Sequence, residues 1–168
     1  MAEKGGQKRS GTRDGVKESL FSADSVEIEI IVSWSGEEKD GEEFKGSILT
    51  RVRLTWDGAL AHLSLKGEEA RNRISLLKMF ANSVAGRLRP AMERHGYTKI
   101  KHLTGKIEAA VFDKIIEELQ GRGYVRAADP PKYVRQARKY WRLTGKAIQR
   151  LAELPAGDGK IIPPETYE

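Results

Sequence analysis

The chain has 168 residues, of which 39% are hydrophobic and 32% are charged, and its formal net charge is +6 at pH 7. This length and apolar content suffice for one substantial core or two small ones, and the positive balance suits a polyanionic partner. The sequence has no cysteine, which excludes disulfides and thiol chemistry, and no apolar run of about 18 residues, so we expect a soluble, intracellular, cytoplasmic protein without a membrane partner.

Positive charge is concentrated in two segments. Residues 67–103 contain eight Lys and Arg against three acids, and residues 130–154 contain seven against one. Within the second segment, the run KYVRQARKYWRLTGKAIQRL (residues 132–151) holds three aromatic residues and no acid. We expect a partner to dock on these two segments, although salt-bridged, solvated surface is the alternative explanation of such charge.

The first regular apolar pattern begins at Val26. Residues 1–25 are rich in Gly, Ser and charge, so we expect a flexible arm there. In VEIEIIVSW, apolar side chains alternate with polar ones from Val26 to Trp34. This alternation predicts a strand with one buried face.

A similar alternation flanks Asp57-Gly58, a dipeptide that favours a type I′ turn. We therefore predict a hairpin within residues 47–67, in which Trp56 pairs with Ala59. In this register one face is apolar, and the opposite face gathers Arg51, Arg53, His62, Ser64 and Lys66.

The basic side chains of that polar face have two possible roles. Arg51, Arg53, His62 and Lys66 could contact a phosphate backbone. Alternatively, they pair with Glu27 and Glu29 on the adjoining strand, and we favour this structural role slightly.

A helix is expected after Gly67, because Glu68 and Glu69 would complement the positive end of its dipole. The predicted apolar stripe consists of Ile74, Leu77, Phe80 or Ala81, Val84 and Leu88. We expect this helix to cover the apolar face of the sheet. Pro90 can start a second short helix that Gly96 ends.

The next predicted helix begins with Thr104 as its N-cap and ends at Gly121. Its apolar positions are Ile107, Val111, Phe112, Ile115, Ile116 and Leu119. The sequence GYVR follows it and predicts a strand.

The pattern VFDKIIEELQGRGYVR…KYWRLTGKAIQRL resembles the second half of a winged-helix (winged helix-turn-helix) DNA-binding domain, over about residues 104–154. The resemblance implies that the helix ending at Gly121 is a recognition helix and that a β-hairpin wing follows. Residues 140–143 would form the returning strand of the wing, and Thr144 would cap a last helix. The outward positions of the implied recognition helix mix both signs of charge, which predicts limited reading of base edges.

A second interpretation of the basic run is one continuous helix from Pro131. Six positions are spaced alternately by three and four residues, as in a heptad seam that could form a dimer: Val134, Ala137, Trp141, Thr144, Ile148 and Leu151. Gly145 opposes this helix, because Gly costs about 1 kcal/mol relative to Ala in a helix interior. We favour the wing and leave the helix open.

The expected fold is α+β, with an arm (1–25), a three-stranded antiparallel sheet covered by a helix (26–103), a winged-helix-like module (104–154) and a flexible tail (155–168). We expect a nucleic-acid-binding protein, with DNA favoured over RNA, that docks through phosphate electrostatics. The candidate contact residues are Lys132, Tyr133, Arg135, Arg138, Lys139, Arg142, Lys146, Lys106, Lys114, Lys99, Lys101, Arg51 and Arg53.

Two further functions stay open: sequence-independent binding of single-stranded nucleic acid, and a non-catalytic adaptor or subunit role with a protein partner or a homodimer. Of the aromatic residues in the basic run, Trp141 is expected in the core, and Tyr133 at the wing tip could stack on a base. The three histidines have no metal-ligand spacing. We therefore expect no metal, cofactor, small-molecule substrate or enzymatic activity.

Overall fold

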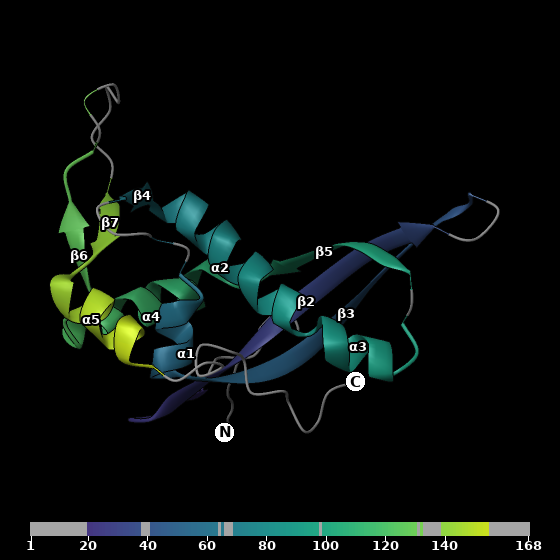
Figure 1. The fold of residues 1–168 in the computed structure, drawn as a ribbon, viewed down its shortest axis with the longest axis horizontal. Helices are drawn as coiled ribbons and strands as arrows, with labels where there is room; N and C mark the ends of the chain where they lie inside the picture. Colours follow the sequence, from purple (N-terminus) through teal and green to yellow (C-terminus); the bar gives the residue numbers. More distant parts are fainter. Residues whose placement is uncertain are drawn as a thin grey trace, which may run out of the picture.

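The computed structural model of the chain describes residues 20–37, 41–63, 65, 69–97, 99–130, 132 and 139–154. In this part of the chain, the strands form one four-stranded and one three-stranded antiparallel sheet, with helices packed against both (Figure 1). The expected α+β class with antiparallel sheets is confirmed. The first sheet has one strand more than predicted.

The four-stranded sheet is built around β2 (Ser25–Glu37). The strand β3 (Glu43–Thr55) pairs with β2 along its whole length, from Ser25 opposite Thr55 to Glu37 opposite Glu43. The other edge of β2 pairs with β1 (Leu20–Phe21) and, further along, with β5 (Ile100–Lys106). The predicted alternation is confirmed, because Val26, Ile28, Ile30 and Val32 are fully buried.

The predicted hairpin at Asp57-Gly58 is wrong. The strand β3 ends at Thr55, and the helix α1 (Trp56–Ala61) follows directly. The Thr55 side chain caps α1 by accepting a hydrogen bond from the Gly58 amide at 2.9 Å, and Asp57 lies in the first turn, where the helix dipole favours an acid. The helical spacing also buries three neighbouring apolar side chains: Trp56, Ala59 and Leu60.

The helix after residue 67 also begins later than predicted. A short strand, β4 (Arg71–Asn72), precedes α2 (Arg73–Arg87), and the Asn72 side chain caps α2 by accepting from the Ser75 amide at 2.8 Å. This cap takes the place of the dipole interaction expected from Glu68 and Glu69. The helix packs against the sheet as expected, and it buries Leu76, Phe80, Ala81, Val84 and Ala85.

Ile74 departs from the predicted stripe, since its side chain is 56% exposed. Ile74 lies two positions before the buried Leu76, which turns it about 200° away around the helix axis. The short helix α3 (Arg89–Arg94) follows α2, and Gly96, at a φ of +96°, terminates it as predicted.

The helix α4 (Ala109–Gly121) ends where predicted and buries Phe112, Ile115, Ile116 and Leu119. Its start is different from the prediction. Thr104 is not its N-cap, because Thr104 pairs with Ser33 inside β5. Glu108 occupies the capping position without a side-chain cap bond.

The basic run contains a strand and a shorter helix. After a reversal at Gly123, which has a φ of +83°, β6 (Val125–Ala128) pairs antiparallel with β7 (Tyr140–Leu143). The Thr144 hydroxyl then caps α5 (Gly145–Glu153) by accepting from the Ala147 amide at 3.1 Å.

The continuous helix from Pro131 is therefore wrong, because the extended backbone of β7 and the cap at Thr144 interrupt it. The predicted returning strand and the predicted last helix are both present. The tip between the two strands (131 and 133–138) lies outside the described residues.

One hydrophobic core contains residues from both sheets and from α1, α2, α4 and α5. The boundary expected between residues 103 and 104 falls inside β5. Within the expected arm, Leu20 pairs with Glu27, and the centre of the Phe21 ring lies 5.6 Å from that of Trp56, so part of the arm belongs to the packed chain. Residues 1–19 and the tail lie outside the described ranges.

Candidate nucleic-acid interface

The β6–β7 hairpin lies at the end of the molecule where α4 and α5 are found, and β7 also pairs with β4 (Figure 1). Its base is fixed by burial of Val125 and Leu143, which lie opposite each other in the register. Tyr140 is also buried, and Trp141 packs against the core as predicted. These buried side chains hold the base of the hairpin against the core, and the other positions of the two strands are more polar.

Two arginines face each other across this hairpin. Arg126 of β6 is directly opposite Arg142 of β7, which places both side chains on one face. Arg126 is exposed and Arg142 is half-buried. The register therefore gathers two positive charges on this face of the hairpin.

Further cations surround the hairpin. Lys132 and Lys139, at the two sides of the tip, are exposed. Lys146, in the first turn of α5, donates a hydrogen bond to the Arg122 carbonyl at 2.9 Å and lies 5.4 Å from the centre of the Tyr124 ring. Lys146 thus ties α5 to the turn after α4 and extends the positive surface to the base of the hairpin.

Three of the candidate contact residues at the predicted wing tip cannot be placed: Tyr133, Arg135 and Arg138 lie outside the described residues. The structure brings Lys132, Lys139, Arg142 and Lys146 together on the hairpin and α5. Arg126 was missing from the candidate list. The signal that could have found it is its place in GYVR, two residues after Tyr124, at the start of the strand predicted to pair with YWRL.

The candidate arginines of the first sheet are engaged within the fold. Arg51 donates to Glu29 at 3.1 Å, and Arg53 lies 4.0 Å from Glu27. The structural role favoured for these arginines is therefore confirmed.

Four other candidate lysines lie apart from the hairpin. Lys101 forms an ion pair with Glu37 at 2.7 Å, whereas Lys106 and Lys114 are exposed at the end of β5 and on α4. Lys99 is exposed on the connection into β5, where it has a φ of +62°. These four lysines do not form one patch with the hairpin, since they lie on three separate elements.

Two arginines of the basic segment 67–103 are also paired with acids. Arg73 makes two bonds to Asp113 of α4, at 2.7 and 3.1 Å, and Arg71 pairs with Glu69. The Asp113 contact raises the pKa of Arg73. The contact also occupies a polar position on the outward side of α4, which leaves that helix with fewer groups for reading bases.

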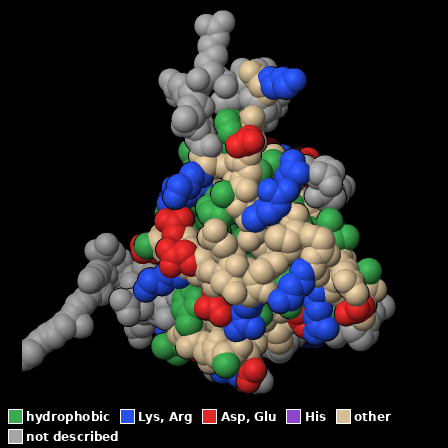
Figure 2. Space-filling model, turned by 90° about the vertical axis from the view of Figure 1, so that its left-hand side faces the viewer, with side chains coloured by type: hydrophobic (Ala, Val, Ile, Leu, Met, Phe, Trp, Pro, Cys, Tyr) green, Lys and Arg blue, Asp and Glu red, His purple; other side chains and the backbone are tan. Residues whose placement is uncertain are grey.

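An ion pair joins α5 to α1. Arg150 donates to both carboxylate oxygens of Asp57, at 3.0 and 2.7 Å. The hydrogen bond from Arg150 lowers the pKa of Asp57, and the same contact raises the pKa of Arg150. Because its guanidinium is held by Asp57, Arg150 is a structural residue. Figure 2 shows this end of the molecule, with acidic side chains among the Lys and Arg side chains.

His62 was predicted on a polar sheet face, and this is wrong. It follows α1, is 3% exposed, and its Nδ1 lies 2.6 Å from the Ser83 hydroxyl of α2. Burial and the charge of Arg87 lower the pKa of His62 to about 4. The reason for the difference is the helix at 56–61, which turns the following residue toward α2.

Among the described residues, no group of three or more His, Asp or Glu side chains is arranged to hold a metal ion. In the same residues, no helix is long and apolar enough to cross a membrane. No protein-family model, curated protein or solved structure matches the chain. The geometry of the chain itself is thus the basis for a functional proposal.

Proposed function

We propose that the chain binds nucleic acid, with duplex DNA favoured, and that the β6–β7 hairpin and the start of α5 contact its phosphate backbone. The observation that carries this proposal is the cross-strand pair of Arg126 and Arg142. Two guanidinium groups side by side on one face of a hairpin can contact neighbouring phosphates of one nucleic-acid backbone.

The surroundings of the pair support the same partner. Lys132 and Lys139 are exposed along the hairpin, and the sequence from Pro130 to Ala152 has no acid. The order of helix, Gly turn, strand, returning strand and Thr-capped helix is also the one that the winged-helix resemblance implies. In this proposal, α4 reads few bases, because Asp113 and Glu118 are engaged with Arg73 and Arg122.

A salt titration tests the proposal. Binding of labelled duplex DNA, single-stranded DNA and RNA is measured by fluorescence anisotropy from low to moderate salt. We expect log affinity to fall linearly with log salt for the wild type. Replacing Arg126 and Arg142 by Ala should reduce the slope by up to about two, because two phosphate contacts are removed.

The matched control replaces Lys78 and Arg94, which are exposed on α2 and α3, by Ala. This control removes the same charge and should leave the slope near the wild-type value. An affinity that does not change with salt concentration would contradict the proposal and favour the adaptor role. Equal slopes of log affinity against log salt for the two double variants would have the same meaning.

A further inference from the structure

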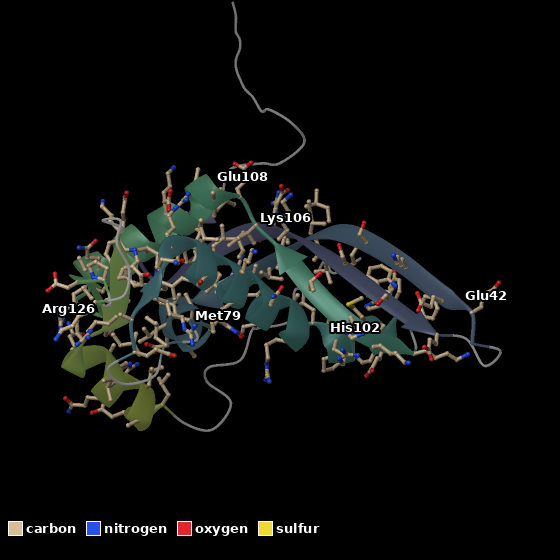
Figure 3. All side chains as sticks on the ribbon, turned by 90° about the horizontal axis from the view of Figure 1, so that it is seen from above. Glu42, Met79, His102, Lys106, Glu108 and Arg126 are labelled. Atoms are coloured by element: carbon tan, nitrogen blue, oxygen red, sulfur yellow. The ribbon has the colours of Figure 1, made fainter. Side chains whose placement is uncertain are left out.

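The outer edge of β3 is a long strand edge that the fold leaves open. The inner edge of β3 pairs with β2, and in the described part of the chain no other strand pairs with the outer edge. Figure 3 shows β2 between β3 and β5, the strand that carries the labelled His102 and Lys106. Bulges and prolines usually protect such edges from further pairing. The register of β3 with β2 has no bulge, and β3 contains no proline, so its outer edge can accept another strand.

The half of β3 nearest the turn has incompletely buried apolar side chains on both faces. Phe44 and Ile48 are half-buried on the face toward the core, and Leu49 is 47% exposed on the other face. The indole of Trp34 lies over Gly46, where a Cβ atom would collide with the ring. The glycine thus lets this ring extend from β2 across β3. A strand added at the outer edge would cover these apolar groups.

The charges of β3 are distributed unevenly along the strand. Glu43 stands at its start, opposite a second acid, Glu37 of β2. Glu37 is paired with Lys101 at 2.7 Å, whereas Glu43 is exposed and has no ion pair in the described part of the chain. Arg51 and Arg53 lie in the second half of β3. An antiparallel copy of the same strand would therefore bring its basic half toward Glu43.

We propose that the chain forms a homodimer in which the outer edges of two β3 strands pair antiparallel about Ser47. A two-fold axis perpendicular to the sheet then places Ser47 opposite Ser47 of the second copy, and Glu43 opposite the partner's Arg51. Residues 43–51 of both copies form the ladder, and the two sheets become one. The dimer does not include the β6–β7 hairpin, so this inference is independent of the proposed function.

The charges favour this register over its neighbours. Opposed residues must point to the same face, so each possible two-fold axis passes through one residue of β3. An axis through either of the next two residues places Lys45 opposite an arginine of the partner, Arg51 in one case and Arg53 in the other. Like charges at opposed positions destabilise a sheet. The axis at Ser47 instead places Lys45 opposite the partner's Leu49, which the aliphatic part of the lysine can cover.

The opposite-charge pair of this register is compatible with the contacts inside each chain. Arg51 already donates one hydrogen bond to Glu29 at 3.1 Å. A guanidinium group has five N–H donors, so Arg51 can also bind the partner's Glu43. The two-fold axis forms this pair twice.

The core-facing side of the ladder is also complementary. In this register, Ile48 lies opposite the partner's Gly46, over which the partner's Trp34 ring extends. The isoleucine of each copy therefore packs against the indole of the other. The helix α1 follows Thr55, beyond the paired residues, so the helical parts of the two copies lie at opposite ends of the ladder.

Sedimentation equilibrium over a range of protein concentrations tests the dimer. We expect the wild type to dimerise reversibly. Glu43→Lys should raise the Kd of the dimer by about tenfold, because two opposite-charge pairs become two like-charge pairs. Glu93→Lys, at an exposed position on α3, makes the same charge change and should leave the Kd near the wild-type value. Thermal melts establish that both variants are folded.

Cysteine cross-linking tests the register. The chain has no cysteine, so Ser47→Cys would place a single thiol opposite its own copy, at a Cα separation of about 4.5–5.5 Å that a disulfide can span. Leu49→Cys is the matched control on the same face of β3, because the two thiols would lie about 13 Å apart along the strands. Under mild oxidation we expect a disulfide-linked dimer from Ser47→Cys and little from Leu49→Cys.

Three results would overturn the inference. The first is a wild type that stays monomeric at the highest concentration measured. The second is an equal Kd for Glu43→Lys and Glu93→Lys, and the third is at least as much cross-linking from Leu49→Cys as from Ser47→Cys. The second and third would place any dimer contact at another surface or in another register. None of the three concerns binding of nucleic acid, which the salt titration tests separately.

Discussion

Two antiparallel strand pairs in this molecule differ in the charges that lie opposite each other across the strands. Across β2 and β3, acids of one strand face arginines of the other, as in the pair of Glu29 and Arg51. Across β6 and β7, Arg126 faces Arg142. The first arrangement neutralises charge between the strands, whereas the second gathers two positive charges on one face. An arginine on a strand is therefore a poor guide to a binding surface, because its role depends on the residue across the strand.

Truncating Trp56, in the helix α1, should have the largest effect on the free energy of unfolding. Trp56 begins α1, is 3% exposed, donates from its indole nitrogen to the Ser22 carbonyl at 3.0 Å, and lies 4.9 Å below the Arg122 guanidinium. Trp56→Ala should lower the free energy of unfolding by about 3–5 kcal/mol, the usual range for such core truncations. Urea unfolding followed by circular dichroism measures this change.

Because Trp56 contacts β1 and α4 together, we expect both regions to lose stability in a single transition. Trp56→Phe is the matched control and should lose less. Two separate transitions, with only one of them shifted, would show that the regions are held independently.

Acid should weaken the fold through His62, which packs between α1 and α2. The pKa of His62 is lowered from 6.5 to about 4 by burial and by Arg87, so the folded chain resists protonation that the unfolded chain accepts. The stability contributed by neutral His62 is complete above pH 6.5 and is lost as the pH falls from 6.5 toward 4. The loss should reach about 3 kcal/mol, and the arginines of the hairpin keep their charge throughout this range.

Unfolding free energies measured at several pH values between these limits test the effect. His62→Gln should flatten the profile. His102→Gln, at an exposed position on β5, should leave it as steep as in the wild type. A wild-type profile without any slope in this range would contradict the assignment to His62.

The smallest change in stability is expected from reversing the charge at Arg126. Arg126→Glu places an acid opposite Arg142 and should stabilise the fold by about 0.2–1 kcal/mol, while it weakens binding of nucleic acid. Glu29→Arg creates the reverse case at Arg51 and should destabilise the fold by more than this without weakening binding, because the Glu29 side chain is only 10% exposed. A loss of stability in Arg126→Glu would show that the arginine pair is compensated within the fold.

The parts of the fold that the sequence predicts best are those with a strict period. The alternation from Val26 to Val32 predicts the buried face of β2, and the stripe from Phe112 to Leu119 predicts that of α4. Thr144 predicts the start of α5, because its cap depends on residues only three positions away.

Errors occur where two local signals compete. Asp57-Gly58 is a favourable turn pair, but the cap from Thr55 and the burial of Trp56 favour a helix. Ile74 fits a helical stripe, yet the cap at Asn72 fixes a different face toward the sheet. Ion pairs are harder still to predict from the sequence. Arg150 and Asp57 are 93 residues apart, and no local sequence pattern indicates that they pair.

The candidate site was predicted in part for the same reason. A count of basic residues finds Lys132, Lys139, Arg142 and Lys146, but it gives equal weight to Arg51, which is paired. Arg126 becomes notable only through its partner across the hairpin. Strand register, which the sequence does not specify at the required accuracy, separates these cases.

The position of β5 has a consequence for synthesis of the chain. The edge of β2 that binds β5 is completed only when residues 100–106 are available, long after β2 and β3 have been made. A nascent chain that ends before Ile100 therefore exposes an unpaired strand edge, which can pair with other chains. Folding of this sheet must wait for a contact between distant segments, so we expect it to be slower than closure of the local β2–β3 hairpin.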